Sequence, residues 1–128
     1  MLSSEDCGKI CSTIRTFSPA VRFVGVLGER GELLAYSRRK DLEPLLDSKS
    51  THYQFSHIAI RTGLDAFFDK SLGKVKFVWE ERDGVQIIYF TIGSLHIWMS
   101  IDKMVVRSEV LRIIDSCLPL VKEYSLKL

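Results

Sequence analysis

Several short motifs that would assign a chemistry to this chain are missing from its sequence. No glycine-rich segment leads through Gly-Lys-Ser/Thr into a helix, so Gly25, Gly28 and Gly31 do not predict a nucleotide phosphate site. No His-x-x-x-His pair occurs, which excludes the common helical zinc motif. Polar residues interrupt the longest apolar stretch before it reaches the roughly 20 positions of a membrane-spanning helix. We therefore expect no nucleotide site and no membrane insertion.

Cysteine is scarce and the net charge is small. The three cysteines cannot all pair with one another, which is typical of a reducing compartment. The first nine residues carry acids where a secretory signal needs bases, so we expect a cytoplasmic protein. A net charge of +2 is too mild to indicate nucleic-acid binding. With 128 residues, of which 46% are hydrophobic and 27% charged, the chain is expected to form one domain over residues 1–128.

A pattern of three consecutive strands dominates the second half of the chain. Residues 74–81 alternate between apolar and polar with the period of a strand. Asp83-Gly84 follows as a hairpin turn, and residues 85–92 are apolar at almost every position. Gly93-Ser94 makes a second turn before a strand at residues 95–101. We predict an antiparallel meander that the rest of the chain must cover.

The chain begins with a predicted helix. Ser3 is placed to cap it, and Ser18-Pro19 should end it. Cys7 and Cys11 are spaced like half of a metal site, but zinc needs four ligands and the other candidates are scattered. Both belong to the stripe that should face a core, and buried cysteine behaves as a small hydrophobe. We predict no disulfide and no structural metal; the stripe contains Cys7, Ile10, Cys11, Ile14 and Phe17.

A hairpin should follow this helix. Residues 21–27 are predicted to form a strand that is apolar on both faces, with Val21 and Phe23 on one side and Val24 on the other. Such a strand is typical of the interior of a sheet covered on both sides. A glycine-containing turn leads to a second strand at residues 32–37.

Residues 38–50 are the least regular segment, and we interpret them as a connecting loop. Arg38, Arg39 and Lys40 form the one dense basic cluster of the chain. It could contact phosphate, an acidic partner or a membrane surface, or it could simply be solvated. We single these residues out as a possible partner contact.

A helix predicted at residues 51–70 has two apolar stripes on nearly opposite sides. Its own sheet can cover only one of them, so the other needs a partner within the domain or from another chain. The first stripe contains Phe55, Ile58, Ala59, Thr62 and Ala66. The second, more aromatic stripe contains Tyr53, Ile60, Leu64, Phe67 and Phe68. We predict that the second stripe forms a dimer interface with Lys76 and Val78 of an edge strand at residues 74–81.

The last helix should follow residue 101. Asp102 is placed to cap it, and Pro119 should kink or end it because proline lacks a backbone N–H and clashes with the preceding turn. The order α-β-β-α-β-β-β-α then predicts an α+β three-layer sandwich: one five-stranded antiparallel sheet with helices on both faces.

The histidines and acidic residues do not converge on a catalytic set. His52 and His57 would lie about 140° apart on a helix. His96 shares a strand face with Trp98, which favours a buried histidine beneath a helix. The adjacent acids at residues 80–81 point to opposite faces of a strand, so they do not form a catalytic carboxylate pair. We predict no catalytic, cofactor or metal residues.

This order of elements resembles the roadblock/LC7 fold, a relative of the profilin-like and longin folds, over nearly the whole chain. Local patterns at residues 23–35, the long helix with Ala59 and Leu64, and Gly93 carry the resemblance. The segments at residues 22–26, 45–46 and 59–61 also resemble a group of small archaeal proteins of unknown function. The roadblock/LC7 resemblance implies a homodimer or heterodimer joined edge to edge, with the central helices packed together. It also implies a scaffold or regulator that binds small Ras-like GTPases.

The leading hypothesis is a non-enzymatic, dimeric protein-interaction module. The alternative is a small-molecule sensing domain of profilin-like or PAS-like architecture. A pocket lined by Phe77, Trp98 and His96 would favour the alternative, whereas a filled core and a buried helix–helix interface would favour the dimer.

Overall fold

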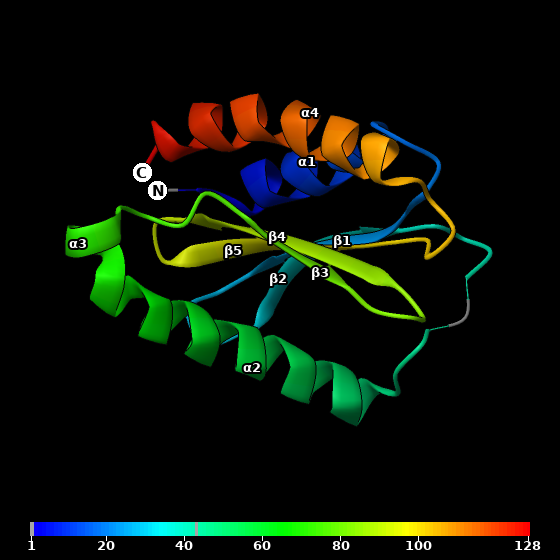
Figure 1. Ribbon diagram of the computed structural model, residues 1–128, viewed down its shortest axis with the longest axis horizontal. Helices are drawn as coiled ribbons and strands as arrows, with labels where there is room; N and C mark the ends of the chain where they lie inside the picture. The colour runs from blue at the N-terminus through cyan, green and yellow to red at the C-terminus, as the bar shows by residue number, and fades with distance from the viewer. Residues whose placement is uncertain (1, 43) are drawn as a thin grey trace.

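The chain folds into three layers in a computed structural model that describes residues 2–42 and 44–128. Met1 lies outside the described residues, as does Glu43 within the predicted loop at residues 38–50. Helices α1 and α4 cover one face of the sheet, and α2 covers the other (Figure 1). The elements are α1 (Ser4–Arg15), β1 (Val21–Leu27), β2 (Leu33–Arg38), α2 (Ser48–Asp65), a 3-10 turn (Ala66–Phe68), α3 (Asp69–Leu72), β3 (Val78–Glu81), β4 (Gln86–Ile92), β5 (Leu95–Ile101) and α4 (Arg107–Ser125).

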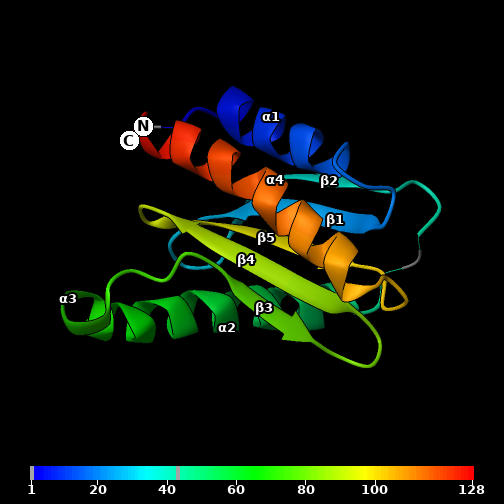
Figure 2. The ribbon, with the colours of Figure 1, turned by 45° about the horizontal axis from the view of Figure 1, so that its top comes forward.

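The sheet has five antiparallel strands in the order β2-β1-β5-β4-β3, which confirms the predicted α+β three-layer sandwich. The hairpin β1–β2 and the meander β3–β4–β5 join through the pairing of β1 with β5. Helix α1 lies over β1 and β2, while α4 crosses β4 (Figure 2). Strands β2 and β3 are left at the two edges.

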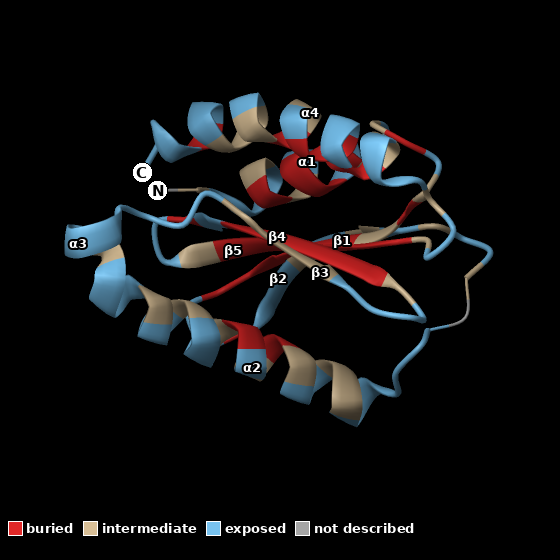
Figure 3. Cartoon of the chain, in the orientation of Figure 1, coloured by how far each residue is buried: buried red, intermediate tan, exposed pale blue. Residues whose placement is uncertain are grey.

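Two apolar cores lie on the two sides of the sheet. The larger core fills the space between the sheet and helices α1 and α4, and it includes all three cysteines. The smaller core lies under α2 and contains Leu27, Phe55, Ile58, Ile87, Tyr89 and Trp98. Most of α2 is therefore exposed or half-buried, in contrast to the buried inner faces of α1 and α4 (Figure 3).

The predicted first helix is confirmed. The Ser3 hydroxyl accepts a hydrogen bond from the Asp6 N–H, and the Asp6 carboxylate accepts one from the Ser3 N–H, which completes a capping box. Cys7, Cys11 and Cys117 are buried and free. Burial raises the pKa of Cys11 and of Cys117 to about 12, because the thiolate would lose its hydration.

Three local predictions are wrong. Val21 lies in the larger core with Val24 rather than sharing a face with Phe23, because the register of β1 against β5 shifts between Val21 and Phe23. Asp102 does not cap the last helix: α4 begins at Arg107, and the Asp102 carboxylate instead accepts hydrogen bonds from two arginines. Of the two outcomes predicted at Pro119, a kink or an end, the end is wrong, because the helix continues to Ser125.

Candidate interaction surface

An apolar stripe on the outer side of α2 is the most conspicuous feature of the described surface. The five residues of the predicted second stripe are exposed, with Phe67 at 84% and Leu64 at 60%. Leu72, in the short helix α3, extends the stripe and is 81% exposed. We call this surface the outer stripe; its residues are Tyr53, Ile60, Leu64, Phe67, Phe68 and Leu72.

The opposite side of α2 holds the helix on the sheet. Phe55 and Ile58 are its buried residues, and the Phe55 ring meets Trp98 edge-on with centroids 5.2 Å apart. Gly31, in the β1–β2 turn, has a φ of 88°, and a Cβ there would lie 2.6 Å from the Phe55 carbonyl oxygen. The turn therefore contacts the backbone of α2 closely only because residue 31 is glycine. With this side fixed, the outer stripe must face away from the sheet.

The beginning of α2 is set by a cap that the sequence reading missed. The Asp47 carboxylate accepts a hydrogen bond of 2.7 Å from the Ser50 N–H, and this bond lowers the pKa of Asp47. The helix consequently starts at Ser48 rather than at residue 51, and it changes to a 3-10 turn at Ala66.

The predicted edge strand is an edge strand, but it is shorter than predicted. Within the described chain β3 pairs only with β4, and it covers Val78–Glu81 instead of residues 74–81. Val78 packs on the α2 side of the sheet, whereas Phe77 and Trp79 pack on the opposite side. Lys76 is exposed and precedes the strand. Val78 therefore lies in the edge strand, and Lys76 lies in the segment that leads into it.

In the basic cluster Arg39 is half-buried, whereas Arg38 and Lys40 are exposed. The Arg39 guanidinium donates to an Asp102 carboxylate oxygen at 2.8 Å and to the Pro19 carbonyl oxygen at 2.9 Å. The hydrogen bond to Asp102 raises the pKa of Arg39. Arg39 therefore holds the loop after β2 against the β5–α4 connection. Arg38 and Lys40 are exposed and remain available for a partner.

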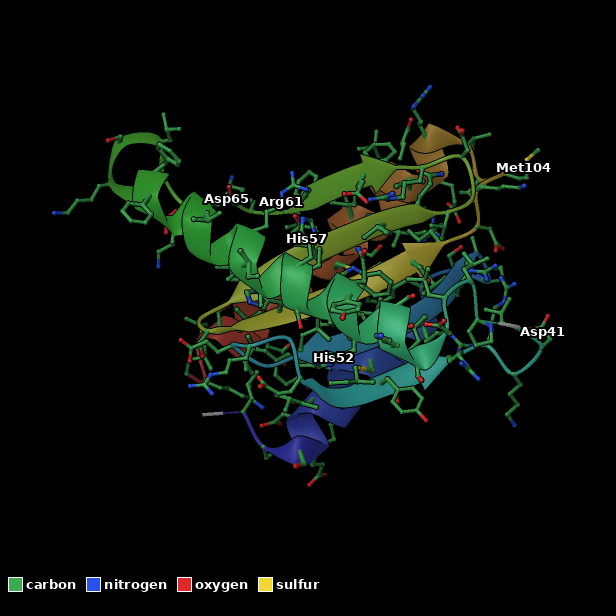
Figure 4. The ribbon with its side chains drawn as sticks, turned by 90° about the horizontal axis from the view of Figure 1, so that it is seen from below. Asp41, His52, His57, Arg61, Asp65 and Met104 are labelled. Atoms are coloured by element: carbon green, nitrogen blue, oxygen red, sulfur yellow. The ribbon has the colours of Figure 1, made fainter. Side chains whose placement is uncertain are left out.

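The histidines do not form a site. His52 and His57 are exposed at separate positions along α2 (Figure 4). His96 is buried beneath α2, with Nε2 3.3 Å from the Thr62 hydroxyl, and burial lowers its pKa. Across residues 2–42 and 44–128, no group of His, Cys, Asp and Glu side chains is arranged to hold a metal ion.

Two pockets flank α2, and they divide the three residues whose common pocket would have favoured the sensing alternative. Phe77 and His96 line a pocket of about 510 Å³ near the end of α2, together with Tyr89. Trp98 instead lines a pocket of about 260 Å³ near the start of α2. The three residues therefore do not surround one cavity.

Solved structures with this arrangement of helices and strands identify the fold. A roadblock/LC7 domain from Streptomyces avermitilis superimposes with a TM-score of 0.64 and 14% sequence identity, covering 93% of this chain and 97% of that one. The chain has the roadblock/LC7 fold. The gliding protein MglB from Thermus thermophilus gives a TM-score of 0.73 at 10% identity, covering 100% and 96%. Profilin II from Acanthamoeba castellanii gives 0.59 at 11% identity, covering 91% and 98%.

The sequence itself matches no protein-family profile and no curated protein. None of the helices in the described ranges combines the length and apolarity needed to cross a membrane. The likeness therefore lies in the fold, and the residues of the interaction surface have to be argued from this chain alone.

Two groups that shape the surface escaped the sequence reading. Leu72 lies beyond the helix predicted at residues 51–70, and it follows the 3-10 turn in the short helix α3. The contacts of Asp102 with Arg22 and Arg39 join residues far apart in the sequence, so no local pattern indicated them.

Proposed function

We propose that this protein is a non-enzymatic, cytoplasmic interaction module that works as a homodimer through the outer stripe of α2 and the β3 edge. The observation that carries the proposal is the exposure of six large apolar side chains along α2, the 3-10 turn that follows it and α3. Single exposed hydrophobic residues are ordinary, but a contiguous patch of this kind marks an interaction site.

The size of the outer stripe supports a protein partner. Its three aromatic residues are 59–84% exposed, and at roughly 200 Å² per side chain they leave on the order of 400 Å² in water. The three aliphatic residues bring the stripe above the roughly 300–600 Å² of the largest patch on a typical monomer. A standard interface buries about 800 Å² per partner, so the outer stripe and the neighbouring edge strand together have the required size.

A second copy of the chain is the occupant that this surface fits. The six residues of the outer stripe are uncharged, and Arg61, which lies within the same arc of the helix, pairs with Glu80 at 3.6 Å, so a two-fold axis would bring mainly apolar surface against apolar surface. The β3 edge next to it offers backbone groups that a symmetry mate can pair. Residues 74–77 precede β3 without strand geometry and keep the alternating pattern of a strand. Pairing with a second copy would extend β3 through them.

Static light scattering tests the dimer. We expect a mass about twice the 14.6 kDa of the chain at micromolar concentration. Amide hydrogen exchange should show protection of residues 74–77 in the dimer, because strand pairing removes their N–H groups from water. A monodisperse monomer would contradict the proposal.

Regulation of a small Ras-like GTPase is the function that the roadblock/LC7 fold supports best. Arg38 and Lys40 lie outside the outer stripe, so a dimer keeps them available to an acidic surface of the partner. Small Ras-like GTPases of the source organism, loaded with GDP or with a non-hydrolysable GTP analogue, should bind the immobilised dimer. Arg38→Glu with Lys40→Glu should weaken that binding and its salt dependence with little loss of stability. Binding that is unchanged by this double substitution would remove the cluster from the partner contact.

A further inference from the structure

The pocket of about 260 Å³ has an apolar lining that its own chain leaves unfilled. It lies between the first turns of α2, the sheet and the loop before α2. Phe23, Phe55 and Trp98 line it, and their rings pack at centroid distances of 5.2 to 6.3 Å. Leu45 and Leu46 of the loop also line it, yet they remain 59% and 45% exposed. The loop therefore covers the pocket without filling it.

Among the described residues that line this pocket, the charged ones are all cationic. Arg22, Arg38 and Arg82 line it, and no carboxylate is among its described lining residues. Arg38 makes no ion pair with any described residue, so its charge is the least compensated of the three. The other polar residues of the lining, Thr51, Gln54 and Ser100, are uncharged.

The neighbouring carboxylates do not neutralise the remaining arginines fully. The Asp102 carboxylate pairs with both Arg22, at 3.3 Å, and Arg39, at 2.8 Å. Arg39 has a second carboxylate, Asp41, at 3.6 Å. Glu80 is likewise shared, between Arg82 at 2.5 Å and Arg61 at 3.6 Å. The pocket therefore combines an apolar interior with a positive rim.

Trp98 adds a donor that has no acceptor. Its Nε1–H is buried and forms no hydrogen bond within the described part of the chain, although the indole ring lines the pocket. Trp79 is the other tryptophan, and its Nε1–H donates to the Gln86 side-chain oxygen at 2.8 Å. A buried N–H without an acceptor is uncommon and calls for a partner.

We propose that this pocket binds a small carboxylic acid with an aromatic or branched apolar body. The body would be buried against the three rings, and the carboxylate would accept hydrogen bonds from the positive rim, with Arg38 as its main partner. A cationic ligand is disfavoured by the arginines. The volume is just below the roughly 300 Å³ at which pockets for drug-sized ligands begin, which indicates a small molecule. The outer stripe lies on the other side of α2, so this site does not depend on the dimer.

The test uses 1-naphthaleneacetate and its amide, which have the same shape but differ in charge. The full 128-residue chain labelled with ¹⁵N is titrated with each, and the two indole N–H signals are followed by NMR. We expect the acid to move the Trp98 signal, leave the Trp79 signal in place, and bind at least roughly tenfold more tightly than the amide, because hydrogen bonds to charged groups are the stronger ones.

Matched variants locate the carboxylate. Arg38→Gln should weaken binding of the acid roughly tenfold. Lys40→Gln removes the same charge two residues away, outside the lining, and should change affinity less than about twofold. Equal affinity for acid and amide, or equal effects of the two substitutions, would overturn the proposal. So would binding that leaves the Trp98 signal unmoved, because the probe would then occupy another surface such as the outer stripe. The dimer is measured separately by mass, so either proposal can fail alone.

Discussion

Replacing Leu64 by aspartate should separate the dimer while leaving the fold intact. Leu64 is 60% exposed in the single chain, so the substitution should change the free energy of unfolding of a monomer by no more than roughly 0.5 kcal/mol, as at other surface positions. In the dimer the same position would lie in the interface. The substitution would then place a carboxylate from each chain in an apolar contact, where neither has a partner.

The expected loss of affinity follows from the area that remains to be buried. Complete burial of a leucine side chain stabilises by ~1.5–3 kcal/mol, and about 60% of Leu64 is available, which gives ~1–2 kcal/mol per chain. Two-fold symmetry doubles this to ~2–4 kcal/mol. At 1.4 kcal/mol per factor of ten, the dissociation constant should rise by roughly 30-fold to 700-fold before the cost of desolvating the carboxylates is added.

The assay is light scattering across the micromolar range, with circular dichroism to verify the fold. His52→Asp is the matched control, because His52 is exposed on the same helix but about 120° around its axis from Leu64. Arg61→Ala should also leave the mass unchanged, since the Arg61–Glu80 pair, 3.6 Å apart, is a surface ion pair. Unaltered mass of the Leu64→Asp variant, or equal dissociation of the His52→Asp variant, would refute the reasoning.

Three further predictions concern the fold. Gly31→Ala should lower the free energy of unfolding in urea by about 2 kcal/mol or more, because a Cβ at φ 88° would collide with the Phe55 carbonyl. Gly63→Ala is the control, because a Cβ at residue 63 would meet only open space. The buried cysteines should resist iodoacetamide at pH 8, and elemental analysis should find no stoichiometric zinc or iron; rapid alkylation of the native protein would contradict their burial. The pKa of Cys11 and Cys117 is about 12, above the value in an unfolded chain, so the free energy of unfolding should fall as the pH rises from about 9 toward 12. Hydrogen bonds from Arg112 and Ser18 lower the pKa of Glu109 to about 2, so the free energy of unfolding should fall as the pH decreases from about 4.5 toward 2. If the Glu109→Gln variant loses as much stability over this pH range as the unsubstituted chain, Glu109 does not cause the loss.

The candidate surface could be predicted from the sequence more fully than the pocket could. Tyr53, Ile60 and Leu64 recur with the period of a helix, so the sequence alone predicts that they share one side of it. The lining of the pocket could not be predicted from periodicity, because Arg38, Phe55 and Trp98 come from three elements that meet only in the folded chain. Whether Phe77, His96 and Trp98 share a pocket also depends on the fold: Phe77 and His96 line one pocket, and Trp98 lines the other.

The sequence by itself determined the order of the elements, the antiparallel meander and the presence of two apolar stripes on the central helix. These features follow from local periodicity and turn residues, which a single stretch of chain contains in full. Only the tertiary structure shows what holds the first stripe on the sheet, because this depends on the fit of Phe55 against Trp98 and of Gly31 against the α2 backbone. It also decided that Val21 faces the larger core and that Asp102 binds Arg22 and Arg39. Strand register and long-range ion pairs depend on residues far apart in the chain, and no local pattern contains that information.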